Sequence, residues 1–174
     1  KSGAAQAGID AGVDMINDIR GLEHDAKMAE TIARGGVPCC LMHNRAGMDS
    51  TRRTGSRGEL SDGGRIDSDA DTAVNRDTDI VEIVRRDLAD ALRFAGQAGI
   101  ARENIILDPG IGFGKTPEEN LRLVGGLERF LDLGCPLLLG CSRKSFIGDA
   151  LGLPVDERLE GTLATTVLAV MKGC

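Results

Sequence analysis

The segment Ile105-Ile106-Leu107-Asp108-Pro109-Gly110-Ile111-Gly112-Phe113-Gly114-Lys115 joins a buried strand to the start of a helix. Its three leading apolar residues predict a short strand, and the proline and three glycines after Asp108 predict a tight turn. A helix start follows, because Pro117 suits a first helical position and Glu118 and Glu119 suit a first turn. The segment therefore predicts a strand with Asp108 at its carboxyl end, which is where α/β folds place functional groups.

Apolar strands and helical stretches alternate on both sides of this segment. The predicted strands cover residues 13–16, 37–42, 105–107 and 136–139, and the predicted helices cover 2–11, 26–34, 80–95, 121–133 and 155–171. Strands joined by helices run parallel through right-handed crossovers, so their carboxyl ends share one rim. A (β/α) barrel and an open flavodoxin-like sheet both fit this pattern. In either fold the rim collects Asn17, Asp18, His43, Asn44, Arg45, Asp108, Arg143, Lys144 and Ser145.

About four parallel strands are half of an eight-stranded barrel, and an open half leaves two unpaired sheet edges. The chain of 174 residues also begins at Lys1 inside a helical stretch. We therefore expect residues 1–174 to be one α/β domain within a larger protein. Residues 46–75 are rich in glycine and polar side chains, which predicts a long surface loop.

Composition excludes several classes of function. The net charge is −6 and the chain has no Trp or Tyr, which argues against nucleic-acid binding. No apolar run approaches the 18 residues of a membrane-spanning helix. Five cysteines without regular spacing indicate reduced thiols, and we expect a cytoplasmic protein.

Three motifs are candidates for chemistry. Asp108 is either a turn cap or a buried carboxylate that accepts paired N–H donors from a planar heterocycle. The turn at 140–145 carries two cations and two hydroxyls, which suit an anionic or carbonyl-bearing ligand or else a solvated turn. The amide of Asn17 can donate and accept at once, as a base-like ring requires. A phosphate-binding P-loop is disfavoured, because Pro109 stands where that motif needs glycine.

Metal sites are weakly indicated. Cys39 and Cys40 point to opposite faces of a strand, and no second cluster completes a zinc site with His43, which we interpret as structural. The run 67–71 begins like a calcium loop but lacks its glycine and its closing glutamate.

Four motifs together closely resemble the dihydropteroate synthase family of folate biosynthesis. They are Ile16-Asn17-Asp18-Ile19, Leu41-Met42-His43-Asn44-Arg45, the segment 105–115, and Ser142-Arg143-Lys144-Ser145-Phe146-Ile147-Gly148. The resemblance covers nearly the whole chain, except for a loop at 47–75 that looks longer than usual. It implies a (β/α)8 barrel, and it implies that this chain starts after the third strand and stops before the eighth.

The family condenses 7,8-dihydropterin-6-ylmethyl diphosphate with 4-aminobenzoate, releases pyrophosphate and uses Mg²⁺. By resemblance, Asn17 and Asp108 bind the edge of the pterin, and Lys144 contacts the pterin beside the aminobenzoate. Asp108 and Lys144 are the expected catalytic pair. The expected substrate-binding residues are Asn17, Ile19, Met42, Asp108, Phe113, Lys144 and Ser145.

The resemblance places the magnesium and most diphosphate contacts in segments that this chain lacks. We therefore expect no metal ligands here, an inactive isolated chain, and a homodimer at full length. Two alternatives stay open: another pterin-binding barrel, such as a methyltetrahydrofolate:corrinoid methyltransferase, and a pterin-binding domain without catalysis.

Overall fold

The computed structural model describes residues 1–45 and 79–174. The predicted loop at 46–75, with the calcium-like run inside it, lies outside the described residues. Within them, the elements follow one another as α1 (Ser2–Asp10), β1 (Ile16–Asp18), α2 (Met28–Gly35), β2 (Cys39–Met42), α3 (Ile80–Gln97), β3 (Ile105–Asp108), α4 (Pro117–Gly125), α5 (Ser145–Leu151) and α6 (Leu159–Met171). Short 3-10 helices cover Arg102–Asn104, Leu127–Leu133 and Val155–Glu157.

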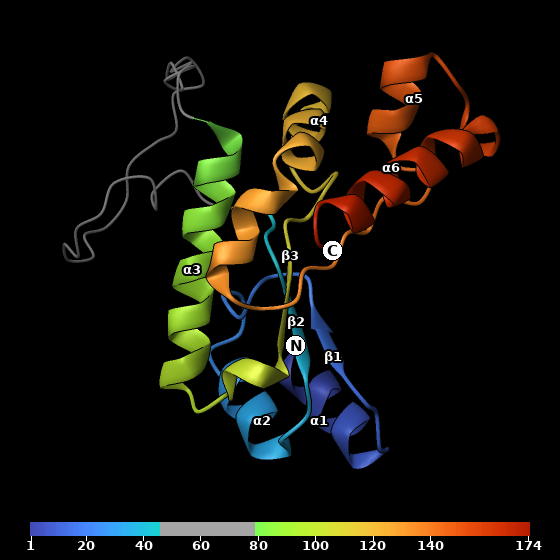
Figure 1. The fold of residues 1–174 in the computed structure, drawn as a ribbon. Coiled ribbons are helices and arrows are strands. Elements are labelled where there is room, and N and C mark those ends of the chain that lie inside the picture. Colours follow the sequence, from blue (N-terminus) through green and yellow to red (C-terminus); the bar gives the residue numbers. More distant parts are fainter. Residues whose placement is uncertain (46–78) are drawn as a thin grey trace, which may run out of the picture.

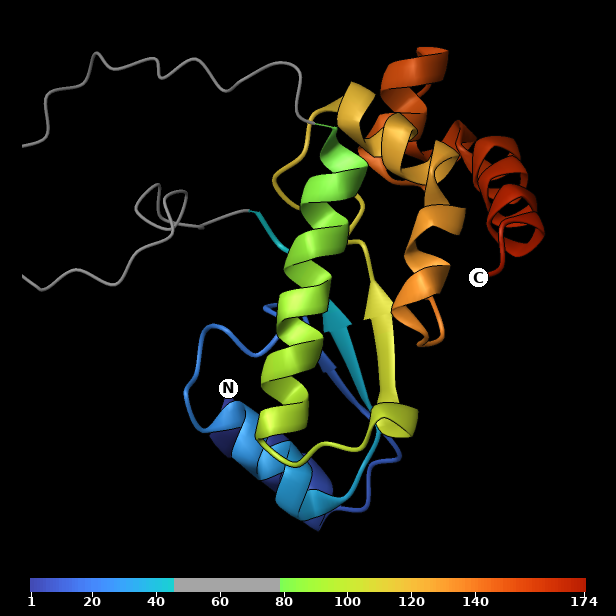
Figure 2. The ribbon, with the colours of Figure 1, turned by 60° about the vertical axis from the view of Figure 1, so that its left-hand side comes forward.

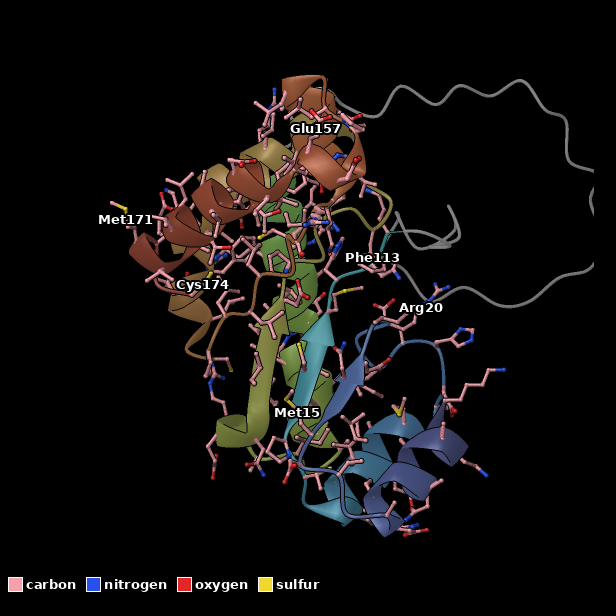
Figure 3. The ribbon with its side chains drawn as sticks, turned by 90° about the vertical axis from the view of Figure 1, so that its right-hand side faces the viewer. Met15, Arg20, Phe113, Glu157, Met171 and Cys174 are labelled. Carbon is pink, nitrogen blue, oxygen red and sulfur yellow. The ribbon has the colours of Figure 1, made fainter. Side chains whose placement is uncertain are left out.

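The strands form a parallel sheet in the order β1-β2-β3. This sequential order fits a (β/α) barrel, in which each strand pairs with the next along the chain. The helix α3 runs along one face of the sheet, and the arrowheads of the strands point toward α4 and α5 (Figure 1, Figure 2). On the opposite face, none of the described helices lies over β1 and β2 (Figure 3). The predicted shared rim is therefore present at one end of the sheet.

The hydrophobic core lies between the sheet and α3. Leu41 and Leu107 from the strands and Val84 from α3 have no exposed side-chain surface. The stripe predicted along 80–95 forms α3, and Asp79 caps the helix by accepting a hydrogen bond from the Val81 N–H. No helix within residues 1–45 and 79–174 is long and apolar enough to cross a membrane.

The first strand begins three residues later than the sequence predicted. Val13 is exposed, and its N–H donates to the carbonyl of Gly8 at 3.1 Å, so it closes the end of α1 instead of pairing with β2. Pairing starts at Ile16, whose N–H donates to the Pro38 carbonyl at 2.9 Å. Asn17 consequently lies inside β1 and not after it.

The predicted strand at 136–139 is reduced to one parallel bridge between Leu107 and Leu137. Two hydrogen bonds make this bridge, one from the Leu107 N–H to the Pro136 carbonyl at 2.9 Å and one from the Leu138 N–H to the Leu107 carbonyl at 2.8 Å. The segment still lies beside β3, in the position of the next barrel strand. The predicted helices at 121–133 and 155–171 are each divided into a 3-10 helix and an α-helix.

Candidate functional site

The strand register decides which side chains can meet. Paired residues of parallel strands share a face, and neighbours along a strand alternate between faces. Met42 pairs with Asp108 and Asn17 pairs with Cys40, so all four project from the face opposite α3. Asp18 pairs with Leu41 and therefore projects toward the helices. The sequence placed both Asn17 and Asp18 on the rim, and only Asn17 shares a face with Asp108.

The backbone around Asp108 permits only glycine at its second following residue. The Asp108 carboxylate accepts a hydrogen bond from the Gly110 N–H at 2.7 Å, and the Asp108 carbonyl accepts one from the His43 N–H at 2.9 Å. Gly110 has φ +69°, and a Cβ there would lie 1.8 Å from the His43 carbonyl oxygen. The turn after β3 is thus pressed against the end of β2, which fixes the direction of the Asp108 side chain.

The buried side chain of Lys115 stabilises this turn by donating hydrogen bonds to backbone carbonyls. Its ammonium donates to the carbonyls of Gly110 at 2.7 Å, Phe113 at 3.2 Å and His43 at 3.4 Å. Burial, with the charge of Arg45 adding to it, lowers the pKa of Lys115 to about 8. The lysine that ends the glycine-rich motif therefore stabilises the loop and does not bind phosphate as a P-loop lysine does.

Two side chains of α4 hold the turn and its surroundings in place. Asn120, which is buried, accepts from the Gly112 N–H at 2.8 Å and donates to the Thr116 carbonyl at 2.9 Å. Glu119 accepts from the Thr116 N–H at 2.8 Å in a capping box and from the Arg45 guanidinium at 2.8 Å. The rim residue Arg45 is therefore occupied by a structural ion pair.

The ammonium of Lys144 lies over this turn. It donates to the Ile111 carbonyl and stands 4.9 Å from the centroid of the Phe113 ring, a cation–π contact. Two glycines lie beside the lysine: a Cβ on Gly112 would be 3.5 Å from its Cδ and one on Gly140 would be 3.7 Å from its Nζ, both ordinary van der Waals distances. Phe113 itself lies beyond the carboxyl ends of β2 and β3 (Figure 3). Lys144, Phe113 and the strand end that carries Asp108 therefore meet.

The charges of Asp108, Lys144 and Lys115 influence one another's pKa values. Burial raises the pKa of Asp108, while the Gly110 N–H and the charges of Lys144 and Lys115 partly oppose that rise. Burial lowers the pKa of Lys144, and Asp108 opposes it. Burial, and after it the charge of Asp108, raises the pKa of Cys40 to about 12, so this thiol on the same face is not a nucleophile. An acceptor for N–H donors and a cation are thus available side by side.

The other predicted site residues lie around Asp108, Phe113 and Lys144, at different distances along the sheet. Met42 is buried beside Asp108 on the same face, whereas Asn17 is exposed and separated from β3 by one strand, about 10 Å at usual strand spacing. Ile19 is exposed just after β1, and its carbonyl accepts from the Asn44 amide at 3.1 Å. Ser145 is exposed as the first residue of α5. Asn17 and Lys144 thus come from opposite sides of β2 and β3, with Asp108 between them along the sheet.

His43 faces the helices. Its Nε2 lies 3.3 Å from a carboxylate oxygen of Asp87 on α3, and burial lowers its pKa although Asp87 opposes this effect. Among the described residues, no group of three or more His, Cys, Asp or Glu side chains could hold a metal ion. Its buried Nδ1 has no hydrogen-bond partner among the described residues, so the structural interpretation of His43 stays a prediction that the contact with α3 supports.

A protein-family model described as "Pterin binding enzyme" matches residues 1–174. The chain belongs to the pterin-binding enzyme family. Among curated relatives, the dihydropteroate synthase of Clostridium beijerinckii is 46% identical over 172 residues, which are 99% of this chain and 54% of that protein. The chain spans about half the length of the curated bacterial synthases that it matches at 40% identity or more.

Solved structures give the same relationship. A dihydropteroate synthase from Clostridium difficile, crystallised in the presence of pteroic acid, has a TM-score of 0.80 and 36% identity, and the match covers 99% of this chain and 56% of that one. The synthase of Xanthomonas albilineans in complex with 7,8-dihydropteroate has a TM-score of 0.79 and 30% identity, covering 100% and 56% of the two chains. The described residues therefore form part of a (β/α)8 barrel, as the resemblance implied.

Sequence reasoning missed the residues that hold the site in place. It assigned no role to Asn120, and it placed Arg45 on the rim without predicting its ion pair with Glu119. A sequence signal existed for one contact only: Thr116 and Glu119 have the spacing of a capping box. The carbonyl contacts of Lys115 have no such signal, because they depend on how the turn closes.

Proposed function

We propose that this chain carries the pterin-binding half of a dihydropteroate synthase, which condenses 7,8-dihydropterin-6-ylmethyl diphosphate with 4-aminobenzoate and releases pyrophosphate. The observation that carries the proposal is the meeting of Asp108, Phe113 and Lys144 at the end of β3, on a chain similar to synthases along its whole length. Neither of the alternative functions has a specific observation in its favour.

In this proposal the pterin lies across the face opposite α3. The Asp108 carboxylate accepts N–H donors from one edge of the ring, and the Asn17 amide pairs with a polar edge from the side of β1. Met42 and Phe113 form apolar walls, and Ile19 extends the wall beyond β1. The Lys144 ammonium, held above Phe113, contacts the pterin where the aminobenzoate meets it, and Ser145 lies near the carboxylate of the aminobenzoate.

The reaction that suits this arrangement is dissociative. The bond between the pterin methylene carbon and the diphosphate oxygen breaks first, and both electrons leave with the pyrophosphate. The resulting cation is delocalised over the pterin, and the amine of 4-aminobenzoate then attacks the methylene carbon and loses a proton. An anionic Asp108 beside the ring stabilises the positive charge that develops in the transition state.

Magnesium remains part of the proposal for the whole protein, although the described residues do not fit it. They contain no cluster of three candidate metal ligands, and both oxygens of Asp18 are occupied by backbone N–H groups. We therefore derive no step through the ion and expect its ligands elsewhere in the protein. We also propose cytoplasmic localisation and a homodimer of the complete protein.

The test is synthesis of 7,8-dihydropteroate by the protein expressed from its complete coding sequence. Product formation that requires both substrates, and that a sulfonamide inhibits in competition with 4-aminobenzoate, would support the proposal. Binding of 6-hydroxymethylpterin without product and without any sulfonamide effect would replace it with a non-catalytic pterin binder. The 174-residue chain is the matched control, and we expect no turnover from it.

A further inference from the structure

The residue before Lys144 has an unusual backbone. Among the described residues, Arg143 and Leu22 are the two that have positive φ without being glycine, and Arg143 has φ +48°. A left-handed conformation costs a residue with a Cβ roughly 1 to 2 kcal/mol, so other contacts must hold it. Such outliers gather at functional sites, and this one adjoins the lysine that reaches over Phe113.

The contacts that hold Arg143 come from two side chains near the start of α6. The Arg143 N–H donates to the Thr162 hydroxyl at 2.9 Å, and the Arg143 carbonyl accepts from the Arg158 guanidinium at 3.2 Å. Both backbone polar groups of the left-handed residue are thus bonded to side chains of a segment that the candidate site does not otherwise use.

Further hydrogen bonds fix the side chains of Thr162 and Arg158 in place. Thr162 donates its hydroxyl hydrogen to the Arg158 carbonyl at 2.9 Å, so its oxygen lone pairs face the Arg143 N–H. The Arg158 Nε donates to the Leu153 carbonyl at 3.1 Å. The guanidinium also packs closely on Gly148 in α5, where an added Cβ would lie 2.3 Å from Nη2. A glycine at 148 is therefore what lets Arg158 reach the turn.

We propose that Thr162 and Arg158 are positioning residues: they hold Arg143 in its left-handed conformation and thereby aim the Lys144 ammonium at the Phe113 ring and the site beside Asp108. The inference rests on the proposed function for its catalytic consequence, but its geometric part does not need that function. Within the described residues, no hydrogen bond joins either side chain to Asp108, Phe113 or Lys144, so both act through the turn.

The test compares isosteric variants in the protein expressed from its complete coding sequence. Thr162→Val keeps the volume and removes the acceptor for the Arg143 N–H, and Thr162→Ser restores it. Thr165→Val is the matched control, because Thr165 lies on the same helix and is buried, and among the described residues its hydroxyl bonds only to the Gly161 carbonyl of its own helix, at 2.7 Å.

We expect Thr162→Val to lower kcat about tenfold while the KM for the pterin substrate changes less than about twofold, since misaimed catalytic groups reduce rate more than binding. Thr162→Ser should recover kcat, and Thr165→Val should retain it. If both valine variants lower kcat equally, or if Thr162→Ser does not recover it, the positioning role is wrong.

A second readout needs no substrate. The NMR signals of the Lys144 ε-CH₂ group should show an aromatic ring-current shift from Phe113, which Thr162→Val should reduce and Thr165→Val should leave unchanged. Should Thr162→Val not fold, Arg158→Lys serves instead, because an ammonium cannot bond the Arg143 and Leu153 carbonyls in the geometry of the guanidinium fork. A wild-type protein that shows the shift but makes no product would reject the proposed function and leave the positioning intact. An unchanged shift in the variants would reject the positioning.

Discussion

Asp18 and Asp108 occupy equivalent places in the chain but differ in how many of their carboxylate oxygens accept hydrogen bonds. Each is the last residue of a strand, each is 7% exposed, and each accepts a backbone N–H from the turn that follows. Asp18 uses both oxygens in this way, accepting from the Arg20 N–H at 3.1 Å and the Leu22 N–H at 2.7 Å. Asp108 uses one oxygen, and its other oxygen accepts no hydrogen bond from the residues that the structure describes.

The two carboxylates differ in their partners because they project from opposite faces of the sheet: they pair with neighbouring residues of β2, and neighbours along a strand alternate between faces. Asp18 pairs with Leu41 and faces the helices, whereas Asp108 pairs with Met42 and faces the open side of the sheet. A carboxylate that projects toward the core has to bond to nearby N–H groups, because burial without partners is costly. A carboxylate on the other face keeps an acceptor for a ligand. The same residue type is thus structural on one face and available for chemistry on the other.

The turns that follow the two aspartates should differ most in their tolerance of a side chain. Gly110 and Gly21 both have positive φ. A Cβ on Gly110 would lie 1.8 Å from the His43 carbonyl oxygen, whereas one on Gly21 would lie 3.2 Å from the Met42 carbonyl oxygen. We expect Gly110→Ala to lower the free energy of unfolding by at least about 4 kcal/mol and Gly21→Ala by about 1 to 2 kcal/mol, measured by urea unfolding.

Gly36→Ala is the control for backbone conformation alone, because Gly36 has φ +64° and open space around its Cα. It should cost about 1 kcal/mol. Equal losses in Gly110→Ala and Gly36→Ala would show that the close approach to β2 does not matter.

Asp108→Asn should separate activity from stability. The amide oxygen can still accept the Gly110 N–H, but the negative charge at the proposed pterin position is lost. We expect dihydropteroate formation to fall at least about 100-fold, the usual effect of removing a group that stabilises charge in a transition state. Stability should not fall, because burial already disfavours this carboxylate, as its raised pKa indicates. Turnover within threefold of wild type, at unchanged stability, would remove Asp108 from the mechanism.

Sequence reasoning succeeded where a local pattern determines the outcome. The apolar run at 37–42 contains β2, the run at 105–107 forms all of β3 except its last residue Asp108, and the helical stripe after Asp79 forms α3. It could not assign Asp18 to the correct face, because facing depends on register, and register depends on where pairing with the neighbouring strand begins. A shift of the predicted start from residue 13 to Ile16 placed Asn17 and Asp18 inside β1. Contacts between distant segments, such as those of Arg158 with the turn at Arg143, leave no mark in a single sequence.

Asp18→Asn should show the reverse of the behaviour expected at position 108. Asparagine has one acceptor oxygen where the native carboxylate uses two, so one of the N–H groups of Arg20 and Leu22 loses its partner. We expect a loss of about 1 to 2 kcal/mol in the free energy of unfolding, with dihydropteroate formation within about twofold of wild type. A loss of turnover larger than the loss of stability explains would mean that Asp18 reaches the substrate.

The smallest effect expected is a pH dependence that belongs to Asp108 alone. Burial raises the pKa of this carboxyl above the ordinary 3.8, so the folded state holds the proton more tightly than the unfolded state. Stability must then fall as the pH rises from 3.8 through the folded-state pKa, and it stays constant above that value as far as this group is concerned. Asp108→Asn removes the proton linkage. Wild type should therefore lose stability relative to this variant across that window and match it most closely at lower pH, as urea unfolding in a pH series would measure. A wild type that gains stability relative to Asp108→Asn over the same window would mean that N–H donors and cations outweigh burial at this carboxylate, and Asp108 would then resemble Asp18 after all.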